Sequence, residues 1–163
     1  MSIPMNVQND ANHQWMRYAL TLAERAQAAG EVPVGAVIIL GEDIIGEGFN
    51  TCIGASDPTA HAEIVAIRHA GSQLGNYRML DTCLYTTLEP CAMCAGAIVQ
   101  ARIGRVVIGA RDQRWGAGGS VLNVLDNPAL NHRAVVQIGV EADACARLLK
   151  DFFRARRPTS TLA

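Results

Sequence analysis

The order of strand-like and helix-like segments is the feature of this sequence that most restricts the fold. Five short apolar runs favour strands, and four segments with helical periodicity precede, separate and follow them. The expected strands are Val34–Leu40, Ile44–Asn50, Cys83–Thr87, Arg105–Ala110 and Ala134–Gly139, and the expected helices are 10–30, Ala60–Ala70, 90–103 and Glu141–Arg157. This order predicts an α/β fold: a three-layer α/β/α domain whose five-stranded mixed sheet is covered by helices.

Local signals mark the turns between these elements. Gly41-Glu42 is expected to join the first two strands into a hairpin. Asp57-Pro58-Thr59 predicts the start of the second helix, with a proline early in the helix and a hydroxyl at its N-cap. A glycine-rich loop around Gly116 is expected to precede a short helical piece near Val121–Leu125.

The chain length fits one domain spanning 1–163. A chain of 163 residues buries roughly 70% of its unfolded surface and needs neither a disulfide nor a metal merely to fold. The N-terminal segment lacks the pattern of a secretory signal, and the longest apolar run, Val34–Leu40, is much shorter than the about 18 residues of a membrane span. Five cysteines without secretory context indicate a reducing compartment and metal binding or catalysis. A cytoplasmic location with no membrane partner is expected.

Charge is distributed unevenly, although the formal net charge is only −1. Residues 1–99 hold four arginines against ten acidic residues, whereas residues 100–163 hold nine arginines and Lys150 against five acidic residues. The second part of the chain is therefore basic, which indicates a surface able to meet phosphate. Ordinary scatter of solvated charges is the alternative explanation.

Two short motifs carry the chemistry. The first is His61-Ala62-Glu63, at the start of the second expected helix, and the second is Pro90-Cys91-Ala92-Met93-Cys94, at the start of the third. Cysteines three residues apart share one helix face, and a helix N-terminus favours the thiolate form that binds zinc. Two thiolates and one imidazole suit zinc, and three protein ligands leave a fourth position for water, as in catalytic zinc sites.

Each motif alone has a simpler explanation. A Cys-x-x-Cys pair can be a redox pair, although that assignment requires a thioredoxin-like context and leaves His61 without a function. A lone histidine is more often a packed or exposed residue than a ligand. Because both motifs begin a helix after a loop, we favour a shared zinc site formed by His61, Cys91 and Cys94.

Glu63 is the candidate catalytic residue. It lies two positions after His61, and residues two apart on a helix do not share a face, so Glu63 is a poor fourth ligand. From the first turn, however, its carboxylate can point toward a metal-bound water and carry a proton from it. The alternative is an acidic residue that only complements the helix dipole.

The last expected helix carries a basic stripe. At 100° per residue the basic side chains share one face, and the apolar ones lie opposite. The stripe faces either solvent or phosphate, since a helix C-terminus favours cations in any case. Phe153 lies off the apolar face, where it can stack on an RNA base or serve as a partly buried anchor. The stripe consists of Arg147, Lys150, Arg154 and Arg157.

The chain resembles the zinc-dependent nucleobase deaminases, and in particular the bacterial tRNA-specific adenosine deaminases. His-x-Glu followed by Pro-Cys-x-x-Cys is common to the cytidine and deoxycytidylate deaminase superfamily, and further segments resemble the tRNA branch. The resemblance covers about residues 13–157. The matching segments are Glu31–Val37, Asp57–Glu63, Thr87–Ala97, Gly109–Asp112, Asn131–Arg133 and Asp151–Arg154.

This resemblance implies a cytidine-deaminase-like fold and a zinc-dependent hydrolytic enzyme. The implied reaction converts the wobble adenosine of a tRNA anticodon loop to inosine and releases ammonia. His61, Cys91 and Cys94 match the ligands of one zinc ion per chain, and Glu63 matches the residue that passes protons to the base and the leaving amine.

The resemblance also implies a homodimer that takes up the unpaired loop of an anticodon stem-loop. Asn50 matches an asparagine that binds the flipped base, and Asp112 matches an acidic residue near the substrate nucleotide. Phe153 and Arg154 are the substrate-binding candidates on the last helix. The Arg114-Trp115 pair lies in a loop where the family varies, so the resemblance gives it no function.

Two other functions remain possible from the sequence. A deaminase of free bases, nucleosides or nucleotides would share the zinc motif, but the basic second part of the chain and the tRNA-branch segments disfavour it. A nonenzymatic zinc module would need a fourth protein ligand, which Cys52 or Cys83 would have to supply.

Overall fold

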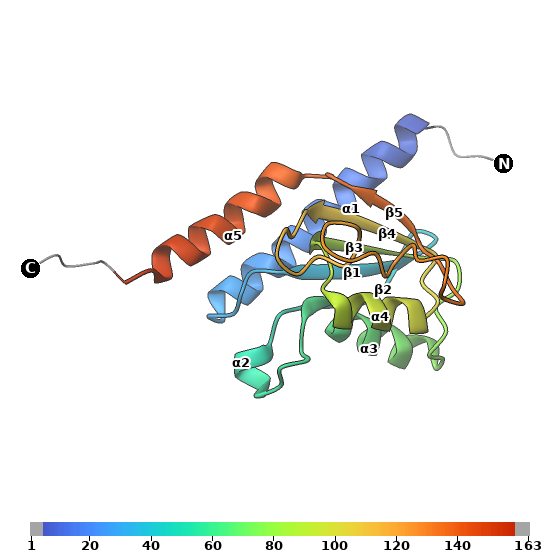
Figure 1. Ribbon diagram of the computed structural model, residues 1–163, viewed down its shortest axis with the longest axis horizontal. Helices are drawn as coiled ribbons and strands as arrows, with labels where there is room; N and C mark the ends of the chain where they lie inside the picture. The colour runs from blue at the N-terminus through green and yellow to red at the C-terminus, as the bar shows by residue number, and fades with distance from the viewer. Residues whose placement is uncertain (1–4, 159–163) are drawn as a thin grey trace, which may run out of the picture.

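The computed structural model describes residues 5–158 and contains one five-stranded mixed sheet between two layers of helices (Figure 1). The strands and main helices follow the expected order, so the predicted fold class is confirmed. The elements are α1 (Met5–Ala28), β1 (Gly35–Leu40), β2 (Asp43–Phe49), α2 (Cys52–Ala55), α3 (Ala62–Leu74), β3 (Thr82–Leu88), α4 (Ala92–Gln100), β4 (Arg105–Ala110), β5 (Val135–Ile138) and α5 (Ala142–Arg156).

The sheet has the strand order β2-β1-β3-β4-β5 and combines both kinds of pairing. β1 is antiparallel to β2 and to β3, whereas β3 is parallel to β4 and β4 is parallel to β5. A short turn with Gly41 at φ +64° joins β1 to β2, but parallel neighbours such as β3 and β4 need a crossover, which α4 supplies. The carboxyl end of β3 therefore leads directly into the cysteine motif at the start of α4.

The helices α3 and α4 cover one face of the sheet, and α1 and α5 cover the other (Figure 1). Side chains alternate between the two faces along each strand. Accordingly, Ile38 of β1 lies in one buried cluster with Ala66 of α3 and Ile98 of α4, whereas Val37 lies in the other cluster with Met16 of α1.

Two glycines allow α3 to lie directly on β2. A Cβ atom at Gly46 would lie 2.5 Å from the carbonyl oxygen of Ala66, and one at Gly48 would lie 2.5 Å from that of Ala62. Both distances are far below van der Waals contact, so this close approach requires glycine. The N-terminus of α3 is thus fixed beside the end of β2, where Asn50 follows.

The predicted start of α3 is wrong. The helix begins at Ala62, and its N-cap residue is His61, which makes no side-chain cap hydrogen bond. The hydroxyl and N–H of Thr59 both donate to Oδ1 of Asp57, at 2.7 and 2.8 Å. These residues form a turn before the helix because the aspartate offers a local acceptor to both donors.

Two further segments differ from expectation. Residues 121–125 form bends and turns instead of a helical piece, and an isolated bridge pairs Gly118 with Asn123. The short helix α2 was not expected, because four residues are too few to show helical periodicity. Among residues 5–158, no helix combines the length and apolar character needed to cross a membrane.

Candidate active site

Two helix N-termini bring the motif residues together. His61 is the N-cap of α3 and Cys91 is the N-cap of α4, and both have extended backbone angles with φ −70°. Cys94 lies in the first turn of α4 and is buried. Because α3 and α4 lie side by side on one face of the sheet, their starts meet near the carboxyl end of β3 (Figure 1).

The donor atoms of these three residues fit a zinc ion. Nδ1 of His61 lies 3.5 Å from Sγ of Cys94 and 3.6 Å from Sγ of Cys91, and all three donor atoms lie within 4.8 Å of one another. Tetrahedral zinc with Zn–S near 2.3 Å and Zn–N near 2.05 Å requires N···S separations of about 3.6 Å. Both observed separations agree with this value, and the donor set is one that zinc prefers.

The two thiols shift each other's pKa in opposite directions. The hydrogen bond from Cys94, together with the neighbouring His61, lowers the pKa of Cys91 to about 4, although burial opposes the shift. The same contact with Cys91 and burial raise the pKa of Cys94. The hydrogen bond to Cys91 raises the pKa of His61. This lowered pKa favours the thiolate form of Cys91, which is the form that binds metal.

No fourth protein ligand belongs to this group. Within residues 5–158, His61, Cys91 and Cys94 form the one cluster of possible metal-binding side chains. Cys52 lies in α2 and Cys83 lies near the opposite, N-terminal end of β3. This arrangement leaves a coordination position open and disfavours the nonenzymatic zinc module.

Glu63 is buried beside these residues. Its side chain belongs to the first turn of α3, and the residue is only 4% exposed. Oε1 lies 3.5 Å from the hydroxyl oxygen of Thr86 on β3. Burial raises the pKa of Glu63, since the ionised form is poorly solvated there. A carboxylate in this environment can hold or release a proton.

Asn50 caps α3 from outside the helix. Its Oδ1 accepts a hydrogen bond from the N–H of Ala62 at 2.8 Å, at the residue that follows His61. The carboxamide therefore lies at the start of α3, next to His61. With its oxygen engaged, the amide nitrogen is the group left to donate to a ligand.

Sequence reasoning missed two buried acidic residues. Glu31 accepts hydrogen bonds from the N–H groups of Ile53 and Gly54, at 3.1 and 2.8 Å, and thereby holds α2. Glu89, two residues before Cys91, is only 2% exposed. Neither residue stands out in the sequence, because its partners are backbone N–H groups of loops that no pattern predicts.

Glu89 organises the loop that follows β4. Its two carboxylate oxygens accept from the N–H of Asp112 at 2.9 Å, those of Gly118 and Ser120 at 3.0 Å, and the hydroxyl of Ser120 at 2.5 Å. Burial by itself raises the pKa of Glu89. The hydrogen bonds lower it by more than burial raises it, so the net pKa lies below the usual range. A Cβ atom at Gly116 would lie 2.4 Å from Cδ of Glu89, so glycine is required there.

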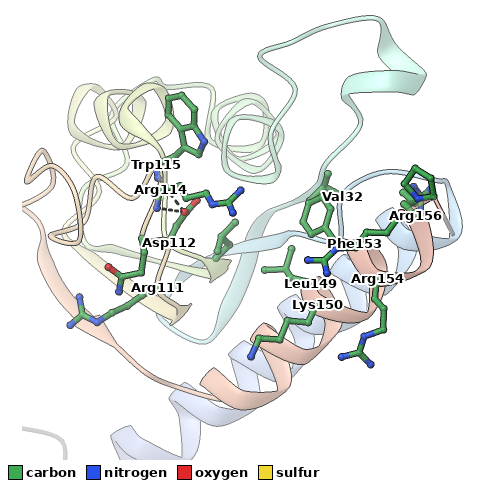
Figure 2. Close-up of a pocket in the computed structure, with 14 residues that line it drawn as sticks. Val32, Arg111, Asp112, Arg114, Trp115, Leu149, Lys150, Phe153, Arg154 and Arg156 are labelled. Atoms are coloured by element: carbon green, nitrogen blue, oxygen red, sulfur yellow. Dashed lines mark hydrogen bonds between the residues drawn. The ribbon is translucent and has the colours of Figure 1, made fainter. Parts of the chain in front are cut away.

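Asp112 turns the same loop. Its Oδ1 accepts hydrogen bonds from the N–H groups of Arg114 at 2.9 Å and Trp115 at 3.1 Å (Figure 2). This carboxylate therefore has a structural function, because it holds the backbone of the two residues to which the family resemblance gave no function.

A cleft of about 960 Å³ lies between this loop and α5. Leu88, three residues before Cys91 in the sequence, belongs to its wall. Figure 2 shows Arg111, Asp112, Arg114 and Trp115 on the loop side, and Leu149, Lys150, Phe153 and Arg154 on the α5 side. The three metal-binding side chains do not line the cleft.

The basic stripe is only partly predicted. Lys150, Arg154 and Arg157 line the cleft, but Arg147 lies in a separate hollow beside Glu141 and Asp143. Arg147 shares the helix face of Arg154 but lies about two turns nearer the start of α5, so it lines a different hollow.

Arg156 was not expected in the cleft. Its Nη2 donates to the carbonyl oxygen of Gly30 at 3.2 Å, and its guanidinium lies 3.8 Å from the ring centroid of Phe152. It lines the cleft and also fixes the end of α5 to the end of α1.

Comparison with known proteins gives consistent results. Residues 9–110 match the cytidine and deoxycytidylate deaminase zinc-binding region. The tRNA-specific adenosine deaminase of Haemophilus influenzae is 50% identical over 152 residues, which are 93% of this chain and 88% of that protein.

Solved structures give the same result. One from a study of A-to-I editing by tRNA:A34 deaminases at the wobble position superposes with a TM-score of 0.80 and 40% identity, over 83% of this chain and 99% of that chain. A guanine deaminase from Nitrosomonas europaea, 24% identical over 93% of this chain and 85% of that chain, shares the fold with a TM-score of 0.75.

Proposed function

From the premise that the chain belongs to the cytidine and deoxycytidylate deaminases, and within them to the tRNA-specific adenosine deaminases, we propose that it converts the wobble adenosine of a tRNA anticodon loop to inosine. The observation that carries this proposal is the three-donor group His61, Cys91 and Cys94 with the buried carboxylate of Glu63 beside it. The cleft between α5 and the loop that follows β4 is lined by several basic side chains, which supports an RNA substrate over a free base.

The reaction exchanges an amine for an oxygen at C6 of adenine. A C6–O bond forms from water, the C6–N bond breaks, and ammonia leaves. His61, Cys91 and Cys94 would hold a zinc ion, which when bound would activate the attacking water at neutral pH.

Glu63 moves the protons. Its carboxylate accepts a proton from the attacking water, donates it to N1 of adenine, and afterwards delivers a proton to the departing amine. Its burial supports this function, because the protonated and ionised forms are then closer in energy than in water. The hydroxyl of Thr86, 3.5 Å from Oε1, helps to orient the carboxylate.

Asn50 and the cleft select the substrate. The amide nitrogen of Asn50 donates to the flipped base while its oxygen holds the start of α3. Phe153 stacks on an unpaired base, and Arg154 meets loop phosphates, because both line the cleft from α5. Asp112 lies in the opposite wall near the substrate nucleotide.

We also propose a cytoplasmic homodimer. A partner surface is supported by exposed apolar side chains, among them Met93 of α4 and Val121 and Leu122 of the loop that follows β4. Size-exclusion chromatography coupled to light scattering tests the homodimer. A mass of two chains is expected, and a single-chain mass at micromolar concentration contradicts the dimer.

The decisive experiment is a substrate panel. Purified protein is incubated with an anticodon stem-loop that carries a wobble adenosine, and separately with free adenosine, guanine and cytidine. We expect inosine and ammonia from the stem-loop alone. Ammonia from guanine or cytidine without inosine in the stem-loop would establish a free-base deaminase instead.

A further inference from the structure

Resting on the proposed function, the structure points to a second base-stacking side chain: we propose that Trp115 binds an unpaired base of the RNA on the cleft wall opposite Phe153. Trp115 is 73% exposed, whereas Phe153 is 49% exposed. An indole offers a large apolar face on which a nucleobase can stack. Figure 2 shows the two aromatic residues on different walls of the cleft.

The backbone that carries Trp115 is held rigidly. Its N–H donates to Oδ1 of Asp112 at 3.1 Å, and the N–H of Asp112 donates to the buried carboxylate of Glu89 at 2.9 Å. The next residue, Gly116, packs against Glu89 and donates to the carbonyl oxygen of Asp112 at 3.0 Å. An exposed ring on a fixed loop loses little entropy on binding, which is the property of a preformed stacking platform.

The surrounding charge favours nucleic acid over a protein partner. Arg111 and Arg114 lie in the same wall as Trp115, and Lys150, Arg154 and Arg157 lie in the wall of α5. Aromatic rings between cations form the kind of surface that binds single-stranded nucleic acid, where bases stack and phosphates meet the cations. An anticodon loop presents several unpaired bases, so one can stack on Trp115 while another occupies the deamination site.

Tryptophan fluorescence tests the contact directly. The chain has two tryptophans, so Trp15→Phe leaves Trp115 as the one reporter. Titration of this variant with the stem-loop is expected to quench its emission in parallel with binding measured by anisotropy. The matched control is Trp115→Phe, in which Trp15, half-buried on α1, should show no quenching.

Steady-state kinetics tests the contribution to binding. Loss of one stacked base typically lowers affinity about 5- to 150-fold, so Trp115→Ala should raise KM by that factor with little change in kcat. Trp115→Phe should recover most of the loss. Tyr77→Ala, which removes a 68% exposed aromatic side chain beyond the far end of α3, should leave KM unchanged.

The outcomes separate this proposal from the proposed function. If the stem-loop is bound and deaminated but neither fluorescence nor KM responds to Trp115, the stacking assignment is wrong and the deaminase assignment stands. If Trp115→Ala dissociates a dimer and RNA does not change the emission of Trp115, the indole ring contacts a second copy of the chain instead of a base. If the unaltered protein fails to deaminate the stem-loop, the proposed function itself is wrong.

Discussion

Removal of the Glu89 side chain should destabilise the protein far more than its place directly after β3 suggests. The carboxylate accepts four hydrogen bonds while almost fully buried. Glu89→Ala leaves the N–H groups of Asp112, Gly118 and Ser120 without their acceptor. Each N–H group that water does not reach then costs about 1–3 kcal/mol of folding free energy. With partial solvation, the free energy of unfolding should fall by about 3–6 kcal/mol.

Glu89→Gln separates shape from hydrogen bonding. The amide oxygen can still accept from two donors, but the amide NH2 then faces the N–H of Asp112, and only the hydroxyl of Ser120 can reverse its direction to accept. One charge-assisted hydrogen bond is lost, which should lower the free energy of unfolding by about 2–3 kcal/mol. At about 2–4 °C per kcal/mol for a chain of this size, Tm should fall by about 4–12 °C.

Urea unfolding of the zinc-loaded protein, followed by circular dichroism, measures both changes in free energy, and thermal unfolding measures the change in Tm. Glu42→Gln in the exposed turn between β1 and β2 is the control and should change stability by less than about 0.5 kcal/mol. A Glu89→Ala variant within about 1 kcal/mol of the unaltered protein would refute the reasoning, because the four hydrogen bonds would then contribute nothing net.

Three further predictions address the metal, the pH dependence and the RNA surface. Cys94→Ser should lower bound zinc well below one ion per chain in elemental analysis; full retention, or a fourth protein sulfur in the coordination sphere by X-ray absorption, would contradict the open three-ligand site. Glu141→Gln should lower the free energy of unfolding by about 1 kcal/mol at pH 7, because the hydrogen bond from His13 of α1 lowers the pKa of Glu141 in the folded state. This stabilisation is present above the unfolded-state pKa of about 4.3 and is lost as the pH falls through the lower folded-state pKa. Urea unfolding near pH 3 should therefore show a smaller difference in stability between the unaltered protein and Glu141→Gln. A difference that does not change with pH would contradict this explanation. Arg154→Ala combined with Arg157→Ala should weaken stem-loop binding and reduce the slope of log K against log salt by roughly 0.7–0.9 per lost phosphate contact. Arg147→Ala, outside the cleft, should leave the slope unchanged, and equal slopes for all variants would mean that the cleft cations are merely solvated.

The sheet and the metal-binding group could be predicted because their signals are local. A run such as Val34–Leu40 shows its β character within seven residues, and His61, Cys91 and Cys94 show their helix-start positions by their own neighbours. The structure adds that the starts of α3 and α4 meet, which follows from the parallel crossover between β3 and β4. The identity of zinc agrees with the family match.

The rest of the site depends on contacts between distant segments. Asn50 caps a helix that begins twelve positions later, and Glu89 binds N–H groups 23–31 positions away. No periodicity records such partners, because a buried carboxylate that accepts from backbone N–H groups requires no particular side chain opposite it. The error at Val121–Leu125 has the same origin, since Val124 donates its N–H to the carbonyl oxygen of Ala117 instead of to a helical partner.

The substrate-binding residues stay predictions. Phe153 and Arg154 line the cleft, and Asp112 both lines it and holds the N–H of Trp115. Each of these positions suits contact with RNA, and each is tested by the variants described above.

Inosine formation in an anticodon stem-loop by Glu63→Gln protein of known zinc content separates the proton-transfer function of Glu63 from metal binding. The substitution removes a proton carrier without removing a metal ligand or changing side-chain shape. We predict one zinc ion per chain, as in the unaltered protein, and turnover lowered by at least roughly 10²- to 10⁴-fold. Near-normal inosine formation by this zinc-loaded variant would contradict the account, because Glu63 would then not carry the protons of the reaction.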